Sequence, residues 1–157
     1  MVRVMATGVF DLLHPGHIHY LDEAKRLGDE LVVVVARDRT AERFKHRPIA
    51  SEAQRLEMVA ALKPVDRALL GREGDIYDIL SEIRPDVIAL GYDQVHDETR
   101  IVEECRKRGL TRTKVVRLPK FEGDLDGTRK IIARVAEYWA LQERLKEVEG
   151  APTGKGG

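Results

Sequence analysis

The sequence feature that most limits the fold is the uninterrupted apolar run ELVVVVA at residues 30–36. A strand with one face in water alternates apolar and polar residues, whereas consecutive β-branched residues indicate a strand that is covered on both faces. Strands of that kind belong mainly to parallel sheets that carry helices on both sides. The run therefore predicts a parallel sheet inside an α/β fold.

The rest of the chain alternates short apolar runs with longer amphipathic segments, as such a sheet requires. Further strands are predicted at residues 2–7, 67–71, 86–91 and 114–118. Helices are predicted at residues 17–27, 51–62, 75–83 and 97–108, and from residue 128 onward. We therefore expect a doubly wound, mostly parallel five-stranded sheet with helices on both faces, in which ligands bind at the carboxyl ends of the strands.

Local signals support several of these helices. Ser51 with Gln54 forms a capping box, and Gly28 follows the first helix as a C-terminal cap. One face of the last helix is marked by Ile131, Ile132, Val135, Tyr138, Trp139 and Leu145. We expect Trp139 to lie in the core, and Cys105 to be a buried small side chain in its helix.

The bulk composition limits the class of protein. A length of 157 residues suits one domain, at residues 1–149, followed by a small-residue tail at 150–157 that is predicted to be disordered. Lys+Arg and Asp+Glu balance at 27 each, so the average charge attracts no nucleic acid. No apolar run is long enough to span a membrane, and the N-terminal segment lacks the apolar region of a signal peptide. These observations predict a cytoplasmic protein without nucleic-acid or membrane partners.

The strongest functional signal is the turn His14-Pro15-Gly16-His17, between the first strand and the first helix. This position is the ligand-binding edge of the sheet. Backbone N–H groups and the positive end of the helix dipole lie there too. Two imidazoles in this setting indicate a polyphosphate site. The alternative is that His14 and His17 only cap the strand and the helix.

The segment GVFDLLHPGH at residues 8–17 resembles the GxFDxxHxGH opening of the HxGH nucleotidyltransferase superfamily, in its cytidylyltransferase-like branch. The segments FKHRPIASEAQRLEMVAALKPVD, ALGYDQ and DGTRKI are similar to the archaeal FAD synthase group, and the likeness extends to about Tyr138. This resemblance implies a Rossmann-like fold and transfer of AMP from ATP to FMN. It implies direct in-line attack with release of pyrophosphate, a divalent metal such as Mg²⁺ carried with ATP, and a homodimer.

The resemblance also implies roles for individual residues. His14, His17 and Lys45 would be catalytic and stabilise the phosphates in the transition state. The nucleotide would be bound by Val9, Phe10, His14, Pro15, Gly16, His17, Asp93, Phe121, Thr128 and Arg129. No carboxylates and histidines have the spacing of a metal site, so no metal ligands are assigned.

Some positions leave alternatives open. Asp126 and Gly127 stand where related chains often carry serines, and Asp126 is also suited to cap the last helix. Arg55 is interpreted equally well as a solvated charge and as a group that reaches the phosphates. Lys45 also fits a solvated charge and Asp93 a turn residue. His19, two residues after His17, is expected to point to another part of the helix surface.

Two other functions compete with AMP transfer to FMN. A CTP-dependent cytidylyltransferase that acts on a small alcohol phosphate, such as glycerol 3-phosphate, shares the opening motif. Such enzymes usually carry an RTEGIST-like final motif, which this chain lacks. A nucleotide-binding sensor without turnover is the alternative from another class, because a fold does not by itself imply catalysis. The intact histidine pair argues against a sensor.

Overall fold

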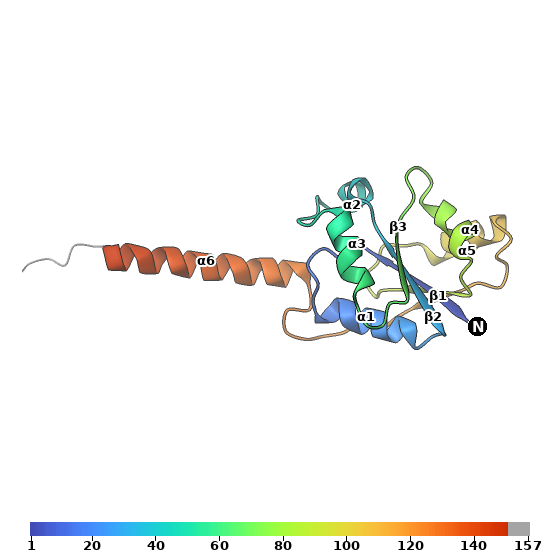
Figure 1. Ribbon diagram of the computed structural model, residues 1–157, viewed down its shortest axis with the longest axis horizontal. Coiled ribbons are helices and arrows are strands. Elements are labelled where there is room, and N and C mark those ends of the chain that lie inside the picture. The colour runs from blue at the N-terminus through green and yellow to red at the C-terminus, as the bar shows by residue number, and fades with distance from the viewer. Residues whose placement is uncertain (151–157) are drawn as a thin grey trace, which may run out of the picture.

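The computed structural model describes residues 1–150, which form an α/β body and one helix that extends from it (Figure 1). The five strands are β1 (Arg3–Gly8), β2 (Glu30–Val35), β3 (Arg67–Leu70), β4 (Val87–Leu90) and β5 (Lys114–Arg117). They form one sheet in the order β3-β2-β1-β4-β5, and every neighbouring pair is parallel. The predicted fold class is confirmed, and the sheet is entirely parallel.

The helices follow the predicted pattern with two differences. They are α1 (Pro15–Lys25), α2 (Asp38–Phe44), α3 (Glu52–Ala60), α4 (Ile79–Ile83), α5 (Glu98–Lys107) and α6 (Thr128–Gly150). Helix α2 was not predicted, because its seven residues are too few to show a helical period. The segment predicted as one helix at 75–83 begins with a 3₁₀ turn, η1 (Ile76–Asp78), before α4 starts.

Each face of the sheet carries its own hydrophobic core. Val33 of β2 packs with Leu21 of α1 and Val59 of α3 on one face. Val32 packs with Ile83 of α4 and Cys105 of α5 on the other. Successive residues of a strand point to opposite faces, so a strand between two cores needs apolar residues at consecutive positions. The prediction that the run at 30–36 is a strand covered on both faces is confirmed. Cys105 is buried, as predicted.

Strand β1 lies at the centre of the sheet, between β2 and β4. The chain adds β2 and β3 on one side of it and β4 and β5 on the other. The direction of winding therefore switches at β1, and loops that leave neighbouring strands at such a point separate and form a crevice. The histidine turn follows β1, so the topology places it in this crevice.

Helix α6 differs from the prediction. It leaves the body as a single straight helix, and none of its residues is buried (Figure 1). Trp139, which was expected in the core, is 64% exposed, because no other element of the described chain covers it. Gly150 is the last residue of α6, and residues 151–157 of the predicted tail lie outside the described part. Within residues 1–150, no helix has the length and apolar character needed to cross a membrane.

Candidate active site

The turn after β1 is shaped by Phe10. Its backbone has φ 53°, in the left-handed region that non-glycine residues rarely occupy. Its ring is buried in the core on the α1 and α3 face. A Cβ on Gly8 would lie 2.9 Å from two atoms of this ring, so a larger residue at Gly8 would displace it. The inverted backbone turns the chain sharply at the sheet edge and leads it toward α1.

The two histidines of the turn lie against each other. His14 is the extended N-cap residue of α1, makes no side-chain cap hydrogen bond, and is followed by Pro15 as the first helical residue. The His14 and His17 rings stack with centroids 3.7 Å apart. Nδ1 of each ring is buried and has no hydrogen-bond partner within residues 1–150. Buried polar atoms are normally satisfied, so these two nitrogens are open to hydrogen bonds that other residues of the described chain do not make. The expectation that these rings cap the helix or the strand finds no support among the hydrogen bonds.

Gly16 makes this close arrangement possible. A Cβ at this position would lie 2.7 Å from the carbonyl oxygen of Asp126 and 2.9 Å from atoms of the His14 ring. Contacts below 3.0 Å with a backbone oxygen cannot be relieved by a side-chain rotation. Only glycine allows the segment before α6 to approach the start of α1 so closely. The motif glycine thus joins two parts of the site that are far apart in the sequence.

Burial keeps both histidines neutral. The pKa of His17 falls to about 3, first because burial penalises the charged ring and then because His14 and Lys45 lie nearby. Burial also lowers the pKa of His14, although Asp126 and Asp93 partly oppose that change. A neutral imidazole has one N–H donor and one acceptor nitrogen. In the absence of an anion, the pair therefore presents hydrogen-bonding groups without a net positive charge.

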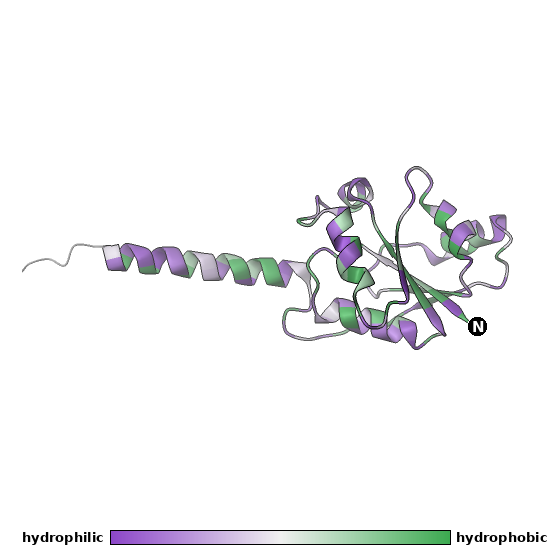
Figure 2. Ribbon diagram, viewed as in Figure 1, coloured by the Kyte–Doolittle hydropathy of each residue, from purple (hydrophilic) through white to green (hydrophobic). Residues whose placement is uncertain are grey.

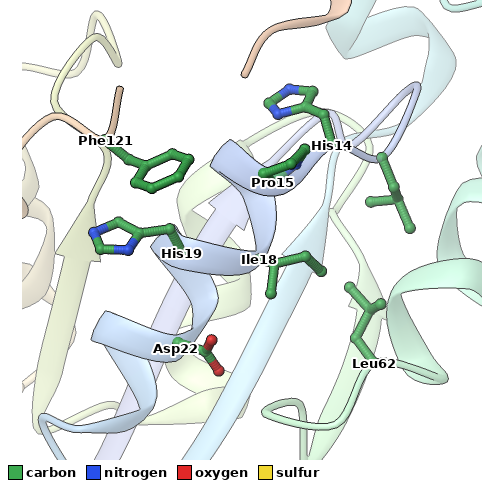
Figure 3. Close-up of a pocket in the computed structure, with 8 residues that line it drawn as sticks. His14, Pro15, Ile18, His19, Asp22, Leu62 and Phe121 are labelled. Atoms are coloured by element: carbon green, nitrogen blue, oxygen red, sulfur yellow. The ribbon is translucent and has the colours of Figure 1, made fainter. Parts of the chain in front are cut away.

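A cavity of about 800 Å³ surrounds the histidines at the carboxyl edge of the sheet. It brings together ten of the predicted site residues: Val9, Phe10, His14, Gly16, His17, Lys45, Asp93, Phe121, Thr128 and Arg129. Pro15 is the exception. It lines a separate hollow of about 590 Å³ along the outer face of α1 (Figure 3). It is the first residue of α1 and lines this hollow together with Ile18 and Asp22 of the same helix.

His19 and Phe121 separate the cavity from the outer hollow, and both residues line both spaces. Their rings stack with centroids 4.7 Å apart (Figure 3). His19 therefore lines the cavity although it lies on another face of α1 than His17. The segment before α6 crosses that face and carries Phe121 onto it.

Arg55 fits neither of its two predicted roles. It is completely buried on α3. Its guanidinium donates to the carbonyl oxygens of Val9 (2.7 Å), Ala36 (2.8 Å) and Ala50 (3.0 Å). It also pairs with Asp38 at 2.7 Å. All five guanidinium N–H groups lie in one rigid plane, which suits it to several fixed acceptors. Arg55 therefore connects the turn after β1 to the C-terminal end of β2 and to the starts of α2 and α3.

Asp11 holds the segment that carries Lys45. Its two carboxylate oxygens accept hydrogen bonds from the amides of Ile49 and Ala50, each at 2.9 Å. The motif aspartate thus acts on the backbone, and its role is to position the loop after α2. Lys45 is the C-cap residue of α2 and lines the cavity from this side.

The opposite wall is held by Gln94 and Arg117. Gln94 donates to the carbonyl oxygen of Thr7 at 2.6 Å and accepts from the amide of Gly91 at 3.1 Å. Arg117 of β5 donates to the carbonyl oxygens of Gly91 (2.9 Å) and Gln94 (3.0 Å). These bonds fix the loop after β4 against the end of β1, and Asp93 lies in that loop.

Asp126 takes a different role from the predicted cap. Its carboxylate accepts from the amide of Gly123 at 3.1 Å and pairs with Lys130 at 2.6 Å. The hydrogen bond from Lys130 and then the Gly123 amide lower the pKa of Asp126. The carboxylate thus closes the loop before α6 and stays ionised beside the histidines.

Sequence reasoning gave no role to the side chains of several residues that line the cavity: Phe44, His46, Tyr92, Gln94 and Lys120. Phe44 and Tyr92 are large side chains that remain 65% and 49% exposed. An apolar residue at the end of a short helix and an aromatic residue after a strand resemble ordinary core positions in sequence. Only the tertiary structure shows that these rings face open space beside the histidines.

Comparison with known proteins agrees with this geometry. The family model described as cytidylyltransferase-like matches residues 5–149. The chain belongs to the cytidylyltransferase-like family. It is 62% identical over 138 residues to a protein of Aciduliprofundum boonei named FAD synthase, covering 87% of this chain and 92% of that protein. It is 53% identical to the protein of the same name from Archaeoglobus profundus, covering 95% of this chain and 94% of that protein.

Solved structures share the fold. A Thermoplasma volcanium protein described as a lipopolysaccharide core biosynthesis protein is 56% identical and superposes with a TM-score of 0.75, covering 78% of this chain and 99% of that chain. Pantothenate synthetase from Thermus thermophilus is 17% identical with a TM-score of 0.51, covering 96% of this chain and 71% of that chain. The second likeness concerns the fold alone, and it confirms the Rossmann-like arrangement.

Proposed function

We propose that this chain is an FAD synthase, which transfers AMP from ATP to FMN. The observation that carries the proposal is the buried His14–His17 pair, whose Nδ1 atoms lack partners, in a chain closely similar to proteins named FAD synthase. The pair stands at the N-terminus of α1, where anions are favoured. A triphosphate supplies the acceptors that this end of the cavity needs.

The reaction is a direct displacement. An oxygen of the FMN phosphate attacks the α-phosphorus of ATP, and the bond from that phosphorus to the bridging oxygen of pyrophosphate breaks. The electron pair of the broken bond leaves with pyrophosphate, and the new bond completes the diphosphate of FAD. The attacking phosphate is already anionic, so no side chain has to remove a proton. Catalysis then consists of positioning and charge stabilisation.

The catalytic residues act on the transferred phosphorus. His14 and His17 donate N–H groups to its oxygens, and a bound anion raises the pKa of both rings toward protonation. Lys45 adds a permanent positive charge from the side of α2. The nucleotide occupies the side of β4 and β5, where Asp93, Phe121, Thr128 and Arg129 line the cavity. The backbone around Val9, Phe10 and Gly16 follows the phosphates.

Mg²⁺ is proposed to arrive with ATP. Within residues 1–150, no three histidine, cysteine, aspartate or glutamate side chains gather to hold a metal ion. Mg²⁺ commonly keeps several waters and binds through substrate phosphates with one or two carboxylates. Asp93 lines the cavity, and we propose its carboxylate as the protein group that binds the ion. The ion supplies charge neutralisation on the pyrophosphate that leaves.

The flavin ring is proposed to bind on the side of β2. Asp93, one of the residues assigned to the nucleotide, lies in the loop after β4, on one side of the turn that follows β1, so the acceptor is proposed to approach the phosphorus from the other side. There the cavity is lined by Phe44 and Lys45. The exposed Phe44 ring offers the isoalloxazine a flat apolar surface, and Lys45 is beside it to receive the FMN phosphate.

We also propose that the chain is a cytoplasmic homodimer. The exposed apolar side chains of α6 support association with a second polypeptide, because large apolar patches on a surface generally mark interaction sites.

The proposal is tested by measuring pyrophosphate release with ATP and with CTP, each with Mg²⁺ and with either FMN or glycerol 3-phosphate. We expect release with ATP and FMN, together with formation of FAD. His17→Ala should abolish turnover while the protein still binds ATP. Release only with CTP and glycerol 3-phosphate would identify a cytidylyltransferase instead. Nucleotide binding without release in all four mixtures would contradict both enzymes and favour a sensor.

A further inference from the structure

Helix α6 carries a long apolar face that nothing in the described chain covers. It spans 23 residues, about 34 Å at 1.5 Å per residue. Its exposed large apolar side chains are Ile132, Val135, Tyr138, Trp139, Leu141, Leu145 and Val148. Figure 1 shows the helix standing away from the body, and Figure 2 shows apolar residues along its length. An uncovered helix of this composition needs a partner surface.

The apolar residues have the spacing of a helix that pairs with another helix. A seam with alternating steps of three and four residues runs through Ile131, Arg134, Tyr138, Leu141, Leu145 and Val148. Five of these six positions are apolar, and the seam continues for nearly three heptads. Such spacing is typical of two helices that wrap around each other. Ile132, Val135 and Trp139 widen the face beside the seam.

We propose that α6 packs antiparallel against α6 of a second copy of this chain. This inference rests on the proposed homodimer and names its surface. The charges of the helix support the orientation. Its first half carries Arg129, Lys130 and Arg134 against Glu137 alone, whereas its second half carries three glutamates against Arg144 and Lys146. Antiparallel packing places the positive half of each helix beside the negative half of its partner and opposes the two helix dipoles.

The register gives a more specific match. When Tyr138 of one helix lies opposite Leu141 of the other, Ile131 meets Val148, and Arg134 meets Leu145. Glu137 and Arg144 are the residues just before the seam positions Tyr138 and Leu145, so they lie along the same edge of the seam. Glu137 of each copy then pairs with Arg144 of the other, which gives two symmetric ion pairs. In a parallel pair, the two Arg134 side chains would instead face each other, and like charges at such a contact are destabilising.

The test is a charge exchange, read by sedimentation of the full-length protein without substrates. Glu137→Arg and Arg144→Glu should each raise the dimer Kd about tenfold, because each replaces two exposed attractions by two repulsions. The double variant should restore the Kd of the unchanged protein. Glu143→Arg is the matched control, since the same charge change on the outer face of the helix should leave the Kd unchanged.

Several outcomes would overturn the proposal. A monomeric wild-type chain at about 50 µM would contradict self-association through α6. A dimer that tolerates both single variants would place the interface elsewhere. Failure of the double variant to recover would exclude the antiparallel register, because in a parallel pair Glu137 faces Gln142 and Arg144 faces Glu149. Since sedimentation requires no turnover, these outcomes are independent of whether the chain makes FAD.

Discussion

His17 links the chemistry of the site to the pH dependence of stability. The folded ring has a pKa of about 3 because it is buried, whereas an unfolded histidine titrates near 6.5. Between these values only the unfolded chain takes up the proton, so acid favours unfolding. The contribution of His17 to the free energy of unfolding is complete above pH 6.5 and is lost as the pH falls toward 3.

We therefore expect His17→Gln to make the free energy of unfolding less sensitive to pH. The slope removed is about 1.4 kcal/mol per pH unit between pH 6.5 and 3. Urea denaturation of both proteins at pH 7, 5.5 and 4 measures the difference, with His46→Gln as the exposed control. Parallel curves for the wild type and His17→Gln would show that folding does not lower the pKa of this ring.

Phe44 is the residue that tests where the flavin binds. We expect Phe44→Ala to raise the KM for FMN about tenfold, because loss of an aromatic stack removes about 1 to 1.5 kcal/mol. The KM for ATP should stay unchanged, since Phe44 is proposed to contact the flavin ring and not the nucleotide. Phe44→Tyr keeps the ring and should behave like the wild type. An equal change in both KM values would place Phe44 outside the flavin site.

At the scale of elements, the site depends on buried connections between strand ends. Arg55 joins the turn after β1, the end of β2 and the start of α3 through carbonyl oxygens, and joins α2 through Asp38. We expect Arg55→Met to lower the free energy of unfolding by about 3 to 5 kcal/mol, because it leaves buried acceptors and one carboxylate without a donor.

Chemical denaturation of Arg55→Met measures this effect, and Arg72→Met is the control. Arg72 also pairs with an acidic residue, Glu82, but both side chains are exposed, so its loss should cost about 1 kcal/mol or less. If the two variants are equally stable, the buried network does not hold the elements together.

The contact between α1 and the segment before α6 is tested by two glycines. Gly16→Ala forces a methyl group to 2.7 Å from the Asp126 carbonyl oxygen, whereas a Cβ on Gly127 would meet no atom within 4 Å. Overpacking of this kind costs about 1 to 3 kcal/mol. Thermal unfolding should therefore show a lower Tm for Gly16→Ala and a nearly unchanged Tm for Gly127→Ala. Equal Tm values would mean that the segment around Asp126 can shift away from α1 at little cost in free energy.

At the scale of the whole molecule, pairing through α6 makes stability depend on concentration. A dimer interface stabilises the folded state by mass action. The Tm of the wild type should therefore rise between 1 and about 100 µM chain. A Leu141→Glu/Leu145→Glu variant should lose this dependence, because two charges would interrupt the seam. A wild-type Tm that is independent of concentration would contradict the dimer.

Much of this molecule was predictable from local patterns. The run at 30–36 predicted a doubly covered strand because a strand between two cores cannot alternate. The turn from His14 to His17 predicted an anion site because strand-turn-helix order determines which atoms meet at a helix start. Ten of the eleven predicted site residues line one cavity. Pattern and motif carry such information because these features involve neighbours in the sequence.

What the sequence did not reveal depends on contacts between distant segments. Arg55 is buried and connects strand ends because four segments of the chain meet around its guanidinium. His19 lines the cavity because the segment that carries Phe121 packs against α1. Trp139 looked like a core residue because apolar spacing shows that a helix face is covered, but not which surface covers it. The sequence by itself therefore determined the elements and the chemistry of the turn. The tertiary structure decided which residues surround that turn and left α6 for a partner, because these outcomes depend on packing across the chain.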